Sequence, residues 1–132
     1  MTLQDPLNLL DSQWRGDGDT WQVWTPGRVN LIGEHIDYHG LAVMPMALTR
    51  GIRVAFRTRN DSTIRAVSGN GYGSRDFVWE KRLQPSVAGD WENYLKAAAQ
   101  AVGDRWGVGR GVDAAVASDL PSAAGLSSST AL

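Results

Sequence analysis

The 132-residue sequence contains no cysteine, which excludes disulfide bonds and any metal site built from thiolates. It also lacks a charge excess: the formal net charge is −1, and no long acidic or basic run is present. No segment reaches the roughly 18 consecutive apolar residues that a membrane-spanning helix requires. The N-terminus has neither the basic nor the apolar region of a signal peptide. These absences predict a soluble, cytoplasmic protein with no nucleic-acid and no membrane partner.

What is present is typical of one globular domain, with 42% hydrophobic and 20% charged residues. Apolar spacing predicts helices over residues 3–14 and 91–106, the second capped by Asp90. Its predicted inner face consists of Tyr94, Leu95, Ala98, Ala101, Val102 and Trp106. Strands are predicted at 21–24, 29–32, 41–48, 52–59, 63–68, 76–80 and 112–118. Mostly antiparallel strands, then a helix and a strand-to-helix turn, predict an α+β domain with a mixed or antiparallel sheet and packed helices.

Residues 26–40 combine charged side chains with glycines and apolar neighbours. The five that stand out are Arg28, Glu34, His35, Asp37 and His39. Buried polar groups need partners, because leaving one unpaired costs roughly 1–3 kcal/mol. Three hypotheses fit: an internal ion-pair network, a site for a polyol whose hydroxyls pair with carboxylates, or a metal site. The spacing of these residues matches none of the common zinc motifs, which weakens the third.

The second informative stretch is residues 120–132, where a Pro/Gly/Ala turn leads into three serines and then helix-forming residues. Free backbone N–H groups and hydroxyls at a helix start can hold a phosphate. No lysine follows Gly125 as it would in a Walker P-loop. The anion would therefore be held by the amides and hydroxyls of residues 125–129, with a divalent ion sharing the charge. The alternative is a simple N-cap by Ser127 or Ser128.

Taken together, the two stretches resemble a known family. Residues 26–38, Pro-Gly-Arg-Val-Asn-Leu-Ile-Gly-Glu-His-Ile-Asp-Tyr, resemble the N-terminal signature of galactokinases. Residues 121–131 resemble the second motif of the wider family of small-molecule kinases that includes galactokinase, homoserine, mevalonate and phosphomevalonate kinases. The resemblance implies that residues 1–132 form a partial N-terminal kinase domain of the ribosomal-protein-S5-like type, with a sugar-binding motif at 26–40 and a phosphate-loop motif at 121–131.

The resemblance also implies roles for individual residues around galactose. Arg28 would lie beside the C1 hydroxyl and the phosphoryl group in transit, as a catalytic and substrate-binding residue. Glu34 and His35 would bind the C6 hydroxyl, and Asp37 the C3 and C4 hydroxyls. Phosphoryl transfer depends mainly on positioning and charge neutralisation, which these groups can supply.

For ATP, the resemblance places Trp91 near the adenine pocket. The phosphate loop would be lined by Ala123, Ala124, Gly125, Leu126, Ser127, Ser128 and Ser129. The Ser128 hydroxyl would reach Mg²⁺. ATP and Mg²⁺ are thus the implied cofactors, and galactose or a related sugar is the implied partner.

In the galactokinase family that this sequence resembles, the catalytic aspartate, a third glycine-rich motif and a C-terminal domain follow the second motif. The sequence is therefore expected to be an N-terminal part that is inactive alone. Where galactokinases usually have Asn-x-Gly after Asp-Tyr, this sequence has His39-Gly40-Leu41. That departure leaves open another sugar, such as N-acetylgalactosamine. A non-catalytic galactokinase-like sugar sensor is the remaining alternative.

Overall fold

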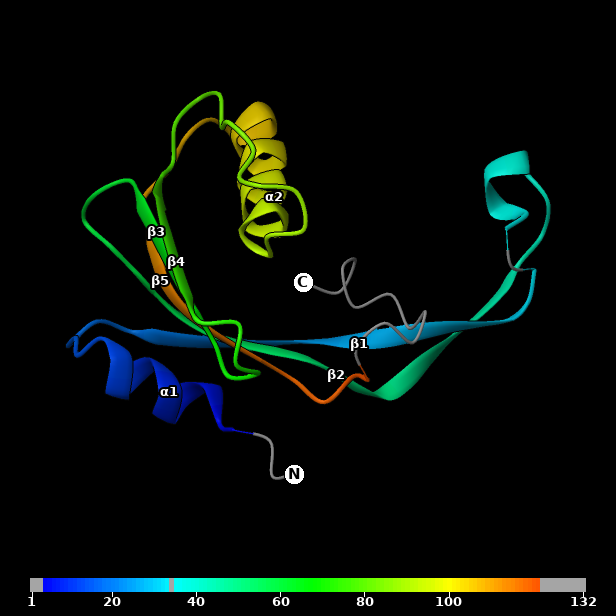
Figure 1. The fold of residues 1–132 in the computed structure, drawn as a ribbon, viewed down its shortest axis with the longest axis horizontal. Helices are drawn as coiled ribbons and strands as arrows, with labels where there is room; N and C mark the ends of the chain where they lie inside the picture. Colours follow the sequence, from blue (N-terminus) through cyan, green and yellow to red (C-terminus); the bar gives the residue numbers. More distant parts are fainter. Residues whose placement is uncertain (1–3, 34, 122–132) are drawn as a thin grey trace.

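The computed structural model describes residues 4–33 and 35–121. Its elements are α1 (Pro6–Gln13), β1 (Thr20–Ile32), the 3-10 helix η1 (Asp37–His39), β2 (Met44–Thr58), β3 (Thr63–Ser68), β4 (Ser74–Val78), α2 (Glu92–Trp106) and β5 (Val112–Ser118). The strands form one mixed sheet in the order β1-β2-β5-β3-β4. In Figure 1, α1 lies below this sheet and α2 above it. The predicted α+β class is confirmed.

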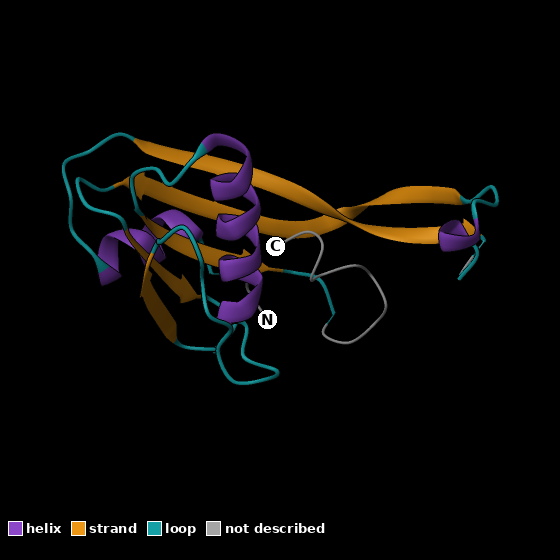
Figure 2. Ribbon diagram, turned by 90° about the horizontal axis from the view of Figure 1, so that it is seen from above, coloured by secondary structure: helices purple, strands orange, loops and turns teal. Residues whose placement is uncertain are grey.

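The sheet is mostly antiparallel, but β5 runs parallel to β3 and antiparallel to β2. The chain between β4 and β5 contains α2 and returns to the middle of the sheet, as a parallel crossover requires. Figure 2 shows α2 crossing above the strands. Neighbouring residues of β5 face opposite sides. Ala115 belongs to a core cluster with Leu9 and Leu10 of α1, and Val116 to a second cluster with Ile52.

Strands β1 and β2 form a hairpin that is longer than the rest of the sheet. Their pairing runs from Thr20 opposite Arg57 to Ile32 opposite Met44. Strand β5 pairs with β2 only over the seven residues from Ile52 to Thr58. The part of the hairpin from Pro26 in β1 to Gly51 in β2 is therefore a two-stranded arm, which projects from the sheet in Figures 1 and 2.

The predicted interruptions of these two strands are wrong. The sequence predicts separate strands on either side of Pro26, whereas β1 is continuous and changes register between Pro26 and Arg28. It is an edge strand, where proline and irregular register are tolerated. Likewise, β2 continues through Gly51. A Cβ there would lie 2.8 Å from Nε1 of Trp24, so the glycine permits close approach of the strands.

A charged network joins the segment after α1 to the sheet. Asp113 accepts hydrogen bonds from Arg65 at 2.6 and 2.7 Å and from Arg59 at 2.9 Å. The Arg65 guanidinium carbon lies 4.8 Å from the ring centroid of Trp14. Burial acts to raise the pKa of Asp113, but the hydrogen bonds from Arg65 and Arg59 outweigh it and hold that pKa below the ordinary 3.8. The carboxylate stays ionised and keeps the network together.

The predicted cap and inner face of α2 are both wrong: the helix starts at Glu92, and its N-cap is Trp91, which makes no side-chain cap hydrogen bond. Asp90 precedes the cap and still contacts the first turn of the helix. Asp90 Oδ1 accepts a hydrogen bond from the N–H of Glu92 at 2.9 Å. Tyr94, Val102 and Trp106 are 48%, 39% and 72% exposed. Periodicity shows which residues share a helix face, but not which face meets the protein. Neither helix in the described residues is long and apolar enough to span a membrane.

Candidate functional site

The tip of the β1–β2 arm is closed by a tight contact between Gly33 and Val43. Gly33 has φ +104°, a backbone conformation that residues other than glycine rarely adopt. A Cβ on Gly33 would lie 2.8 Å from Cγ1 of Val43 and 3.0 Å from its Cα. This position therefore requires glycine for two reasons: its φ is positive, and a side chain would collide with Val43. Residues 35–42, which lie between these two, form a turn that carries His35, Asp37 and His39.

Within this turn, backbone hydrogen bonds hold η1 in place. The N–H groups of His39 and Leu41 donate to the carbonyl of Ile36 at 3.1 and 3.3 Å. The N–H of Gly40 donates to the carbonyl of Asp37 at 3.0 Å, and Gly40 ends the turn with φ +73°. Backbone hydrogen bonds thus hold Ile36, immediately before Asp37, and Asp37 itself.

His35 is strained in a way that often accompanies function. Its φ is +60°, in the left-handed region that residues other than glycine rarely adopt. The ring of Tyr38 contacts the rings of both His35 and His39, with centroid distances of 6.3 and 4.7 Å. All three side chains are exposed. The turn thus offers imidazole and phenol groups to a ligand while its backbone stays fixed.

Asp37 bears directly on the choice between an ion-pair network and a ligand site. Its side chain is exposed, and no ion pair joins it to Arg28 or to any other residue in the described ranges. A carboxylate on a defined turn without an ion-pair partner can accept two hydroxyl hydrogens. The described part of the chain therefore favours the ligand hypothesis for Asp37 over the network hypothesis.

Arg28 lies on the shaft of the arm. It is exposed and pairs with Ala47 across the hairpin, between the two register shifts of β1. At about 3.3 Å per strand residue, its Cα is about 13 Å from that of Ile32 at the end of β1. The structure thus places Arg28, His35 and Asp37 on one hairpin, with Arg28 at its middle and the other two at its tip.

Trp91 is anchored at the start of α2. Its Nε1 donates to the carbonyl of Tyr72 at 3.1 Å. The preceding residue, Asp90, accepts hydrogen bonds from the Glu92 N–H and from Nε of Arg75 at 3.0 Å. These two interactions, the Glu92 one being the larger, lower the pKa of Asp90. Sequence reasoning did not identify Tyr72 and Arg75 as supports of Trp91, because no local pattern marks them.

Several predicted site residues lie outside the described ranges. They are Glu34, and in the phosphate-loop motif Ala123, Ala124, Gly125, Leu126, Ser127, Ser128 and Ser129. Their roles, including the contact of Ser128 with a metal, stay predictions. Among residues 4–33 and 35–121, no group of three His, Cys, Asp or Glu side chains is arranged to hold a metal ion.

The described residues do not bring Trp91 and the hairpin tip together. Figures 1 and 2 both show α2 well separated from η1, which lies at the far end of the arm. Pro121, the first residue of the phosphate-loop motif, follows β5 next to this shaft, as the pairing of Ile52 with Ser118 indicates. The predicted sugar and nucleotide residues therefore lie on different elements, with the start of the phosphate-loop motif near the base of the arm.

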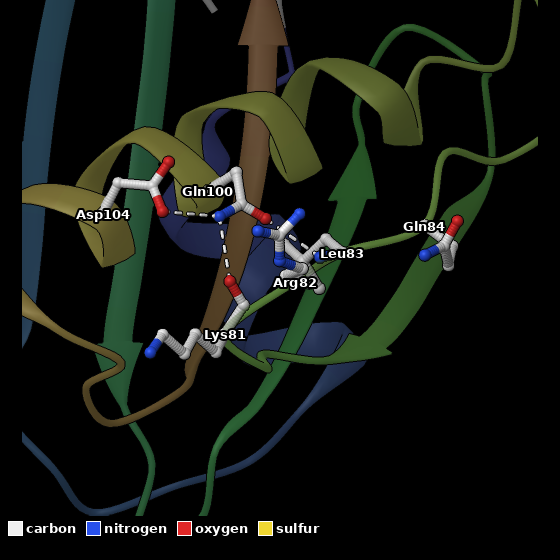
Figure 3. A pocket seen from close by; sticks show the side chains of 6 residues that line it. All are labelled: Lys81, Arg82, Leu83, Gln84, Gln100 and Asp104. Carbon is white, nitrogen blue, oxygen red and sulfur yellow. Dashed lines mark hydrogen bonds between the residues drawn. The ribbon is translucent and has the colours of Figure 1, made fainter.

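A cavity of about 380 Å³ lies between α2 and the loop after β4 (Figure 3). It is lined by Lys81, Arg82, Leu83, Gln84, Gln100 and Asp104. The Gln100 amide accepts from the N–H of Leu83 at 2.9 Å and donates to the carbonyl of Lys81 at 3.0 Å. These hydrogen bonds fasten the loop to the helix. Of the predicted site residues that the structure describes, none lines this cavity.

Comparison with known proteins identifies both motif regions. Residues 16–58 match the galactokinase galactose-binding signature, and residues 93–132 match the N-terminal domain of GHMP kinases. The first match covers β1, the turn and β2, so the hairpin described above is the signature region.

Curated relatives point the same way. The chain is 36% identical to a galactokinase of Glaesserella parasuis, over 96% of this chain and 34% of the relative. It is 40% identical to a galactokinase of Chloroflexus aurantiacus, over 91% of this chain and 30% of the relative. The chain thus spans about a third of the length of these relatives.

Solved structures support the fold independently. Lactococcus lactis galactokinase complexed with galactose matches with a TM-score of 0.80 and 29% identity, over 94% of this chain and 32% of that one. A mevalonate kinase of Methanococcus jannaschii matches with a TM-score of 0.69 and 23% identity, over 89% and 37% of the two chains, a likeness of fold alone. The fold is that of the N-terminal region of GHMP kinases. Within that class, the chain belongs to the galactokinase family.

Proposed function

We propose that the complete protein is a galactokinase, and that this chain supplies its N-terminal, sugar-binding part. The reaction is transfer of the γ-phosphoryl group of ATP to the C1 hydroxyl of galactose. The observation that carries the proposal is the β1–β2 arm. It coincides with the galactose-binding signature and presents Asp37 on a fixed turn without an ion pair in the described residues.

In this proposal, residues at the tip of the arm bind the sugar hydroxyls, and Arg28 on its shaft contacts the reacting groups. Asp37 accepts hydrogens from the C3 and C4 hydroxyls, and Glu34 and His35 bind the C6 hydroxyl. Arg28 lies beside the C1 hydroxyl and the phosphoryl group, where a guanidinium can donate several hydrogen bonds to phosphate oxygens. Because phosphoryl transfer depends on positioning and charge neutralisation, a rigid hairpin that orients the sugar is a large part of the catalytic apparatus.

The nucleotide is bound by other elements. Trp91, held by the Tyr72 carbonyl, packs near the adenine. The amides and hydroxyls of residues 123–129 hold the phosphates. Mg²⁺ prefers oxygen ligands, so the Ser128 hydroxyl suits it, and the ion would neutralise phosphate charge. The cytoplasm, where ATP is available, is the expected location.

A sugar panel tests this proposal. The complete protein is incubated with Mg-ATP and each of galactose, N-acetylgalactosamine, glucose and mannose, and ADP release is followed. Galactose is expected to give the highest kcat/KM. Absence of turnover with every hexose, in a protein that still binds galactose and ATP, would establish the sugar-sensor alternative instead.

One departure in the turn favours a second candidate sugar. Gly40, at φ +73°, ends η1 directly after His39, whereas galactokinases usually have their glycine one position later. A differently ended turn changes the space beside the sugar. A higher kcat/KM for N-acetylgalactosamine than for galactose in the same panel would identify that sugar as the substrate.

A further inference from the structure

Directly after β5, Asp119 forms two hydrogen bonds with Gly51 of β2. The N–H of Gly51 donates to Oδ1 of Asp119 at 2.7 Å, and the N–H of Asp119 donates to the carbonyl of Gly51 at 3.2 Å. Asp119 therefore hydrogen-bonds Gly51 through both its side chain and its backbone. A carboxylate that accepts from a backbone N–H forms a charge-assisted hydrogen bond, which is stronger than a neutral one.

The other side of the same segment is held by Asn70, in the turn between β3 and β4. Its side-chain nitrogen donates to the carbonyl of Ser118 at 2.7 Å, and its oxygen accepts from the N–H of Ser118 at 2.8 Å. The next residue after Asp119, Leu120, is 8% exposed and packs in the cluster with Ile52. Residues 118–120 are thus held by hydrogen bonds to Gly51 and Asn70 and by the packing of Leu120 against the core.

Gly51 lies where the arm leaves the sheet. It pairs with Pro26 of β1, and β2 pairs with β5 only from Ile52 onward. A Cβ on Gly51 would collide with the carbonyl oxygen of Thr25 and lie 3.0 Å from Cα of Pro26. The glycine is therefore confined between β1 on one side and Asp119 on the other.

Two functional segments consequently meet at this pair. Arg28 follows Pro26 by two residues on the shaft of the arm, and the phosphate-loop motif starts at Pro121, two residues after Asp119. We infer that Asp119 is a positioning residue for phosphoryl transfer. It fixes the base of the sugar-binding arm relative to the start of the phosphate-loop motif, and it touches neither substrate. This inference rests on the proposed galactokinase function.

The physical reason is the sensitivity of the reaction to distance. Reacting atoms must approach within about 3–3.5 Å, and a displacement of about 1 Å can reduce turnover by about 100-fold. Loss of the Asp119 acceptor leaves the Gly51 N–H unpaired at the joint between the two segments. The arm and the phosphate-loop motif are then free to shift against each other. The expected result is a lower kcat, with smaller changes in KM.

Three substitutions in the complete protein separate position from charge. Asp119→Asn keeps an acceptor oxygen at the same place without the charge, so it should retain kcat within about threefold. Asp119→Glu keeps the charge but displaces the acceptor by one methylene group, and Asp119→Ala removes the acceptor. Both should lower kcat about 10- to 100-fold. Gln100→Ala is the matched control, since Gln100 also joins two segments through its side chain but lies outside the predicted site.

Kinetic constants are determined per folded molecule, with folding checked by circular dichroism and melting temperature. The inference is supported by a near-normal Asn variant, impaired Glu and Ala variants and a control with unchanged kcat. If Ala does not fold, the Asn and Glu variants decide. The inference is overturned if the folded Glu and Ala variants keep the wild-type kcat, as a purely structural role predicts. An active Glu variant with an impaired Asn variant also overturns it.

Failure of the proposed function is recognised separately, from the wild type alone. A wild-type protein that binds galactose and a non-hydrolysable ATP analogue but shows no turnover defeats the kinase proposal. The inference is then decided by the factor by which galactose changes affinity for the analogue. Asp119→Ala should abolish that factor and Asp119→Asn should keep it. A wild type that binds neither ligand, or whose affinity for the analogue is independent of galactose, defeats the inference as well.

Discussion

Gly33 and Val43 close the tip of the β1–β2 arm by direct contact, so near that a Cβ on Gly33 would lie 2.8 Å from Cγ1 of Val43. This contact brings the two ends of the polar turn together. The turn keeps its shape only as long as the two strands remain this close. The geometry of the predicted galactose ligands therefore depends on a glycine that touches no ligand.

Replacing Gly33 by alanine should damage the site. Gly33→Ala combines an unfavourable φ of +104° with a collision against Val43. Displacement of the turn by about 1 Å is expected to raise the KM for galactose and to lower kcat/KM by about tenfold or more. Steady-state kinetics of the complete protein with varied galactose measure this effect.

Two further variants distinguish the collision from backbone strain. Gly40→Ala has the unfavourable φ of +73° but open space around the added Cβ. The second change Val43→Ala removes Cγ1 and should restore part of the activity of Gly33→Ala, but none of that lost in Gly40→Ala. Equal kinetics for Gly33→Ala and the wild type would show that the contact does not hold the turn.

Asp37 should behave as a ligand and not as a structural residue. Asp37→Asn preserves size but replaces an acceptor oxygen by a donor, so galactose binding should weaken by about 2 kcal/mol, or roughly 30-fold. The melting temperature should hardly change, because Asp37 is exposed and makes no ion pair with a described residue. Calorimetric titration and a thermal melt measure the two quantities. Lost stability with intact affinity would support the ion-pair network.

His35 should show a conflict between stability and function. Its φ of +60° costs roughly 1–2 kcal/mol in a residue other than glycine, and His35→Gly removes that cost. The variant is expected to melt at the same temperature or higher, while its affinity for galactose falls. His35→Ala is the control, because alanine keeps the strain without the imidazole. A His35→Gly protein with wild-type affinity would exclude a ligand role for this side chain.

The network at Asp113 predicts a dependence of stability on acid. The pKa of Asp113 is lowered in the folded state, so its contribution to stability is complete above the unfolded pKa of about 3.8 and is lost as pH falls toward the folded pKa. Asp113→Asn should reduce the free energy of unfolding at pH 7 by about 2 kcal/mol. It should also weaken the decrease of stability below pH 4. Urea unfolding across pH 7 to 2 tests both; identical slopes would contradict the assignment.

Some parts of the fold could be predicted from the sequence because the information there is local. Strands β3 and β5 have their predicted bounds, since each alternates or runs apolar between clear turns. The continuity of β1 through Pro26 could not be predicted, because it depends on that strand lying at the sheet edge. The face of α2 that meets the protein depends likewise on the loop after β4, which local periodicity does not describe.

The candidate site divides in the same way. Arg28, His35 and Asp37 lie within ten residues, so one hairpin places them and the motif alone identifies the segment. The support of Trp91 by Tyr72 spans 19 residues of chain, and the Asp119 contact with Gly51 spans 68. Such long-range contacts follow from strand order and register. They depend on the strand order β1-β2-β5-β3-β4, which local sequence patterns do not determine.

The most direct test of the account is the identity of the product. The complete protein is incubated with Mg-ATP and galactose, and the product is analysed by phosphorus NMR with proton coupling. The account predicts one sugar phosphate whose phosphorus couples to the anomeric proton, as transfer to the C1 hydroxyl requires. A phosphate coupled to the C6 protons, or inorganic phosphate with no sugar phosphate, would contradict it.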